Sequence, residues 1–250
     1  LDPNVSAIHT AIAESYWNLG KPKLSEKYLL IAIKNDPSDK QALQMISDQY
    51  ILEKKYSEAT TYLKKLNYLY PDESRYIIAL AELKKLNQEY KTAMELYLKA
   101  YSLDSNRNEL LETAGRFALQ INDEENAKII FKKLSEIDLD EPRYLSIYID
   151  LLSRSESFQE GINFIQILNE KYGETSDRKA QLALLLFRSG RKDKALELFE
   201  SLTKESPDNP NYYFSLFDIY MEEDQTAKAA ILADQLIANF PEDWRGYYSR

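Results

Sequence analysis

The chain has 250 residues, of which 44% are hydrophobic and 29% are charged, an ordinary balance for a soluble protein. Its formal net charge of −9 disfavours non-specific binding to nucleic acids, because such binding requires a basic face. There is no cysteine, which excludes disulfides and thiolate metal sites, and the longest apolar run, Leu182–Phe187, is far shorter than the about 18 residues that a membrane-spanning helix requires.

A period of 34 residues organises the sequence. Stepping by 34 from Pro3 gives Pro37, Pro71, Ser105, Leu139, Gly173, Pro207 and Pro241. A second set with the same spacing contains only small residues: Ser25, Ala59, Ala93, Ala127, Gly161, Ala195 and Ala229. A fixed period of this length is typical of stacked repeats. We therefore expect residues 1–250 to form a single array in which each repeat contacts mainly its neighbours.

If the recurring proline is position 32, seven complete repeats and a partial eighth follow one another. They begin at Ser6, Lys40, Ser74, Asn108, Pro142, Ser176, Pro210 and Trp244. In the second repeat, Leu43, Ile46 and Tyr50 form one apolar stripe, and Ala59 and Leu63 begin another. Spacings of three and four residues are helical, so each repeat is predicted to contain two amphipathic helices joined by a short turn.

Residues at the ends of these helices support the same division. Proline at position 32 cannot continue the second helix, and Pro142 and Pro210 fall at the first helical position of their repeats, where proline is favoured. Gly20 and Gly190 fall in the turn between helices. Position 33 is expected to cap or charge-stabilise the next helix and comprises Asn4, Ser38, Asp72, Asn106, Asp140, Glu174, Asp208 and Glu242.

The repeat resembles the tetratricopeptide repeat in its length, its small residue at position 20, its large apolar residue at position 24 and its proline at position 32. The resemblance covers essentially the whole chain and implies an all-α fold, a right-handed superhelix whose first helices line a concave groove that binds a partner segment. One version of this family binds a terminal carboxylate through Lys and Asn at positions 5 and 9. Here neither residue type occurs at its position, which disfavours that ligand.

Position 9 should face the groove and is mostly acidic. It comprises Glu14, Asp48, Glu82, Arg116, Asp150, Leu184 and Asp218. These residues are predicted to attract a basic partner segment, since complementary charge speeds encounter and sets register; the alternative is an ordinary solvated helix face. Trp17, Phe187 and Phe214 lie at groove-type positions 12 and 5 and are candidate anchors, with packing between repeats as the alternative.

No catalytic constellation is visible in the sequence. The only histidine, His9, stands where most other repeats carry an apolar residue, so we expect it to pack within its helix. One histidine and no cysteine cannot build the usual zinc site or a Ser-His-Asp triad, and no glycine-rich phosphate loop is present. We predict no enzymatic activity, no cofactor and no metal.

The sequence thus predicts a protein-interaction scaffold without nucleic-acid binding. The chain opens at Leu1 without an initiating methionine and closes at Trp244, Tyr247 and Tyr248, part of a new repeat, which indicates a fragment of a longer protein. Its incomplete end repeats are expected to pack on the rest of the native chain or on another copy of this one. Assembly through these ends is one alternative function; a regulatory or targeting domain of a larger envelope or enzyme system is another. Lys, Asn, Tyr and Ile richness is typical of an AT-rich bacterial genome, and the compartment, cytoplasmic or periplasmic, stays open.

Overall fold

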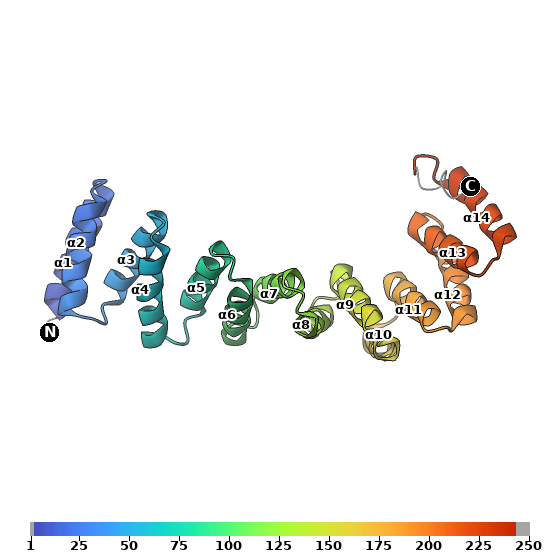
Figure 1. Ribbon diagram of the computed structural model, residues 1–250, viewed down its shortest axis with the longest axis horizontal. Coiled ribbons are helices and arrows are strands. Elements are labelled where there is room, and N and C mark those ends of the chain that lie inside the picture. Colours follow the sequence, from blue (N-terminus) through green and yellow to red (C-terminus); the bar gives the residue numbers. More distant parts are fainter. Residues whose placement is uncertain (1–2, 244–250) are drawn as a thin grey trace. The chain divides into compact units, whose positions relative to one another are not determined.

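The computed structural model describes residues 3–243, and within them the chain is helical throughout, with fourteen α-helices and no strand (Figure 1). The first helices of the repeats are α1 (Pro3–Asn18), α3 (Lys40–Leu52), α5 (Ser74–Leu86), α7 (Asn108–Gln120), α9 (Pro142–Arg154), α11 (Ser176–Arg188) and α13 (Pro210–Glu222). The second helices are α2 (Pro22–Asn35), α4 (Tyr56–Leu69), α6 (Tyr90–Leu103), α8 (Glu124–Ile137), α10 (Phe158–Tyr172), α12 (Lys192–Glu205) and α14 (Thr226–Asn239).

These bounds follow the 34-residue period closely. From α3 onward, every first helix begins at position 1 of its repeat and ends at position 13, and every second helix begins at position 17. Each of the seven complete repeats therefore contains two helices. Trp244, Tyr247 and Tyr248, assigned to a partial eighth repeat, and Leu1 lie outside the described residues.

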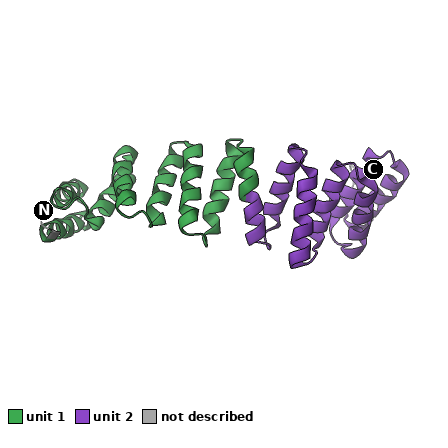
Figure 2. Cartoon of the chain, turned by 90° about the horizontal axis from the view of Figure 1, so that it is seen from below, with its two compact units in different colours: residues 1–130 green, residues 131–250 purple. Residues whose placement is uncertain are grey.

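The chain divides into two compact units, residues 1–130 and residues 131–250, with the boundary inside α8 (Figure 2). In each unit, first helices pack against second helices of the same repeat and of the preceding repeat. Unit 1 has a core that includes Leu29, Leu43 and Leu66, and unit 2 has one that includes Phe199 and Leu216. None of the helices in residues 3–243 combines the length and apolar character needed to cross a bilayer.

Helix capping occurs one position later than the sequence indicated. The residue before α3 is Asp39, at position 34, and its side chain accepts a hydrogen bond from the backbone N–H of Ala42 at 2.9 Å. Thr175 and Asn209, also at position 34, cap α11 and α13 in the same way. The prediction that position 33 caps the next helix is wrong, because this residue lies in the turn after the proline. Asn4 is also a predicted cap, but it lies inside α1, because this helix begins before the first residue of the repeat.

The turn between the two helices of a repeat has the same backbone conformation in all seven repeats. Position 15 has a positive φ in each, and it is glycine only at Gly20 and Gly190. The other five members, with φ between 53° and 60°, are Lys54, Gln88, Asn122, Glu156 and Asp224. The left-handed residue allows the following backbone N–H to reach back into the helix, as from Lys55 to the carbonyl oxygen of Tyr50 at 2.8 Å.

The small residues at position 20 lie where two helices approach closely. All seven are buried. A Cβ atom on Gly161 would lie 2.7 Å from Cδ1 of Leu185, which belongs to the first helix of the next repeat. At Gly161, close approach between α10 and α11 therefore leaves no room for a larger side chain.

Candidate functional site

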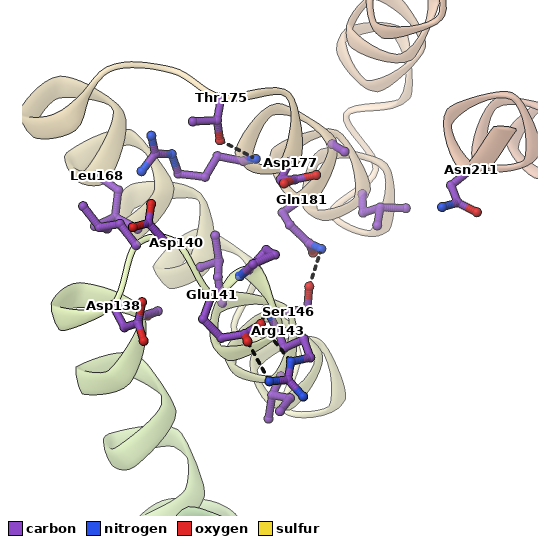
Figure 3. Close-up of a pocket in the computed structure, with 18 of the residues that line it drawn as sticks. Asp138, Asp140, Glu141, Arg143, Ser146, Leu168, Thr175, Asp177, Gln181 and Asn211 are labelled. Atoms are coloured by element: carbon purple, nitrogen blue, oxygen red, sulfur yellow. Dashed lines mark hydrogen bonds and ion pairs between the residues drawn. The ribbon is translucent and has the colours of Figure 1, made fainter. Parts of the chain in front are cut away.

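Unit 2 contains a pocket of about 790 Å³ formed mainly by three consecutive first helices, α9, α11 and α13, and by the turns that precede them (Figure 3). Ser135 of α8 and Leu168 of α10 also line it. In Figure 3, Asp138 and Asp140 lie on the stretch between α8 and α9, and Asn211 lies on α13. Because first helices supply most of its lining, the pocket lies on the face that the family resemblance implies to be a groove.

The pocket has an apolar floor and a polar rim. Leu145 and Leu168 are 7% and 3% exposed, and Leu184 is half-buried beside them. On the rim, Gln181 Nε2 of α11 donates a hydrogen bond to Ser146 Oγ of α9 at 2.9 Å, which links two adjacent first helices. An apolar floor with a few placed polar groups is typical of binding sites.

Acidic residues dominate the charged part of the rim. They are Asp138, Asp140, Glu141 and Asp177. Glu141 forms an ion pair with Arg143, in which Nη2 lies 2.6 Å from Oε2. Hydrogen bonds from the side chain and backbone of Arg143 lower the pKa of Glu141 to about 2, so this carboxylate is ionised throughout the neutral range.

Arg178 is the exceptional residue of the pocket. It is only 7% exposed, although it carries a permanent charge. Its Nη2 donates to the carbonyl oxygen of Gly173, at the end of α10, at 2.5 Å, while its buried Nε has no hydrogen-bond partner. Buried arginine is normally paired with a carboxylate. Within the described residues, the structure records no ion pair for Arg178.

The acidic residues predicted to face the groove have different surroundings. Glu14, Asp48 and Asp218 are exposed, as is the positive member of this position, Arg116. Desolvation raises the pKa of Asp48, and the nearby charge of Arg75 partly offsets this effect. Desolvation followed by repulsion from Glu222 raises the pKa of Asp218.

Two other acidic residues at position 9 interact with neighbours in their own repeat. Glu82 accepts a hydrogen bond from Tyr97 and forms an ion pair with Lys85 at 2.5 Å. Burial would raise the pKa of Glu82, but these two partners lower it below its ordinary value. Asp150 pairs with Arg154 at 2.6 Å. These two carboxylates are less available to a partner than Asp48 and Asp218.

The predicted aromatic anchors are not equally accessible. Trp17 is 36% exposed, whereas Phe187 and Phe214 are half-buried and pack against the core of unit 2. This packing favours the alternative interpretation, packing between repeats, for both phenylalanines. Among all the predicted groove residues, only Leu184 lines the pocket.

Sequence reasoning missed Arg178, although a signal was present. Arg178 stands at position 3, where the other complete repeats carry uncharged residues: Ile8, Ala42, Tyr76, Leu110, Tyr144 and Tyr212. A charged residue at one of seven equivalent core positions is unusual. Comparing the repeats at every position would have identified it.

His9 makes contacts within its own helix pair, α1 and α2. Its Nδ1 lies 2.7 Å from the carbonyl oxygen of Val5, one helical turn earlier, and its ring stacks on Tyr28 with the centroids 6.0 Å apart. Among residues 3–243, no three side chains of His, Cys, Asp or Glu are grouped as metal ligands would be.

Comparison with protein families finds two matches, both described as tetratricopeptide repeat, over residues 6–39 and residues 179–249. No curated protein matches the sequence significantly. A solved structure of Naa15/Naa10 bound to HypK-THB is similar over 98% of this chain, with 12% identity and a TM-score of 0.65. This chain spans only 38% of that one, and at such low identity the likeness shows the fold alone.

Two other solved structures match less closely in shape. One is YrrB, described as a tetratricopeptide repeat protein with an unusual peptide-binding site, with 20% identity, a TM-score of 0.49, and coverage of 75% of this chain and 96% of that chain. The other is a tetratricopeptide repeat protein from Parabacteroides merdae ATCC 43184, with 16% identity, a TM-score of 0.48, and coverage of 98% and 97%. The predicted fold class, an all-α helical-repeat solenoid, is confirmed.

Proposed function

Because this chain is a tetratricopeptide repeat protein, we propose that it holds a segment of a partner protein against its first helices. Repeats of this family are in general non-catalytic, and a protein-interaction scaffold is the function that family and fold support. The observation that supports the groove as the binding surface is the pocket in unit 2. Three successive first helices contribute to it, and its apolar floor and polar rim suit a peptide segment.

The charge of the surface favours a basic segment as the ligand. Glu14, Asp48 and Asp218 are exposed on first helices, and carboxylates outnumber guanidinium groups around the pocket. Because the helices are already folded, the scaffold loses little conformational entropy on binding. Complementary charge should then contribute mainly to the association rate and to the register of the bound segment.

We expect the charge reversals Asp48→Lys and Asp218→Lys, made together, to weaken capture of the protein's main partner by about tenfold at low salt. Both residues are exposed, and neither carboxylate forms an ion pair within the described chain, so their replacement should leave the fold intact. Quantitative affinity capture with the full-length protein measures the effect, and circular dichroism checks helicity.

The matched control is the double variant Glu95→Lys and Glu197→Lys, which makes the same change in charge on exposed positions of the second helices α6 and α12. Capture by this control should remain near the parent value. If both double variants lose capture equally, only net charge matters, and the carboxylates of the first helices have no special role.

A second function, self-association, is favoured by one specific residue. Ile8 is 59% exposed, whereas its counterparts at position 3 of the six following repeats are all buried. An apolar side chain at this position gains free energy when another hairpin covers it. We propose that a second copy of the chain can do so.

Light scattering during size-exclusion chromatography tests the self-association. The parent chain should show a molar mass that rises with concentration, and Ile8→Glu should keep it monomeric, because a charge would have to be buried on association. A parent chain that stays monomeric at its highest soluble concentration excludes this role for Ile8.

A further inference from the structure

Repeat six differs from the other repeats at two adjacent core positions. Positions 3 and 4 carry Arg178 and Lys179, and five of the other six repeats have uncharged, buried or half-buried residues at position 4. Lys179 has acquired a carboxylate partner, since its Nζ lies 2.7 Å from Oε1 of Glu205. Arg178 has no such partner in the described residues. The two substitutions therefore have different consequences: one charge is neutralised within the fold, and the other is not.

Arg178 combines burial with access to the pocket. The side chain is more than nine-tenths buried and lines the pocket, and its Nε is unpartnered. Within residues 3–243, its side chain donates a hydrogen bond only to a neutral carbonyl, that of Gly173. A planar guanidinium in this state has unused donors that match a carboxylate in geometry and charge.

From this geometry we propose that Arg178 receives a carboxylate from an acidic side chain of the bound segment. The inference rests on the proposed function, because it places the partner in the same pocket. The pocket's own acids do not fulfil this role: Glu141 pairs with Arg143, and Asp138, Asp140 and Asp177 form no recorded ion pair with Arg178 among residues 3–243.

The other charges on the rim indicate which residues should flank the acidic residue in the bound segment. Asp138, Asp140 and Asp177 leave the rim negative, which repels a dianion such as phosphate and attracts basic residues. The floor residues Leu145 and Leu168 favour an apolar neighbour. The ligand class is thus a peptide segment with one carboxylate, flanked first by apolar and then by basic residues.

Nuclear magnetic resonance titration of the full-length, ¹⁵N-labelled protein tests the proposal. The probe is the blocked peptide acetyl-KKLELKK-amide, and the matched peptide has glutamine in place of glutamate. We expect the glutamate peptide to bind about tenfold more tightly and to shift the Nε–H resonance of Arg178. In Arg178→Leu and Arg178→Met the two peptides should bind equally, while Arg188→Leu, an exposed change on the same helix, should preserve the preference.

The outcomes separate this inference from the proposed function. Equal binding of both peptides by the parent protein overturns the role of Arg178 but leaves the groove as a binding surface. No binding of either peptide also overturns it, and the groove is then judged by partner capture. A glutamine peptide with a free carboxyl terminus that binds as tightly as the glutamate peptide assigns the site to chain ends rather than to acidic side chains.

Thermal denaturation of the same variants adds a second readout. Since the equivalent position is uncharged elsewhere, Arg178→Leu and Arg178→Met should melt at or above the temperature of the parent. If both variants melt well below the parent, Arg178 stabilises the ligand-free fold, which contradicts the premise that its charge is left uncompensated there.

Discussion

Replacing Leu66 with alanine is expected to lower the free energy of unfolding by about 2–5 kcal/mol. Leu66 lies at position 27 on α4, its side chain is fully buried, and it belongs to the core of unit 1. Truncation removes buried apolar surface and leaves a cavity that the rigid helix pair cannot fully close. Denaturation with urea, followed by circular dichroism, measures the loss.

Leu52 provides the matched control, since it is also a leucine on a helix of the same repeat but is 68% exposed. Leu52→Ala should change the free energy of unfolding by less than about 0.5 kcal/mol. Similar unfolding curves for the two variants would mean that position 27 is not a core position.

Enlarging a small residue at position 20 is expected to be the next most damaging change. Ala229→Leu should cost roughly 1–3 kcal/mol, because Ala229 is only 1% exposed and packs in the core of unit 2 beside Leu216 and Leu232. A larger side chain would force neighbouring helices apart or into unfavourable rotamers. Thermal melting of the purified variant measures this cost.

The adjacent residue provides a control within the same helix. Ala230 is exposed, so Ala230→Leu should leave the melting temperature nearly unchanged. If Ala229→Leu and Ala230→Leu melt at the same temperature, the small residues at position 20 do not mark a close contact between helices.

The helical framework could be predicted because its signals repeat seven times. A single deviation, such as Leu139 in place of proline, does not shift the pattern, and residue 139 still lies in a turn. The caps were misplaced by one residue because Ser38 and Asp39 both have suitable side chains, and only the backbone conformation shows which one precedes the helix.

The candidate site was less predictable because it depends on contacts between side chains. Position 9 is acidic in most repeats, but the sequence does not show that Tyr97 donates to Glu82 or that Arg154 pairs with Asp150. Nor does periodicity show that Phe187 and Phe214 contribute to the core. Arg178 could not be predicted from the features that the repeats share, because it departs from them at position 3.

The left-handed turn at position 15 has a consequence for engineering. Lys54, Gln88 and Glu156 adopt a conformation that costs a residue with a side chain about 1–2 kcal/mol, which exceeds the roughly 0.5–1 kcal/mol entropic disadvantage of glycine. The free energy of unfolding could therefore be increased at these three turns. Glycine replacement at these three positions should raise the melting temperature without changing the first helices.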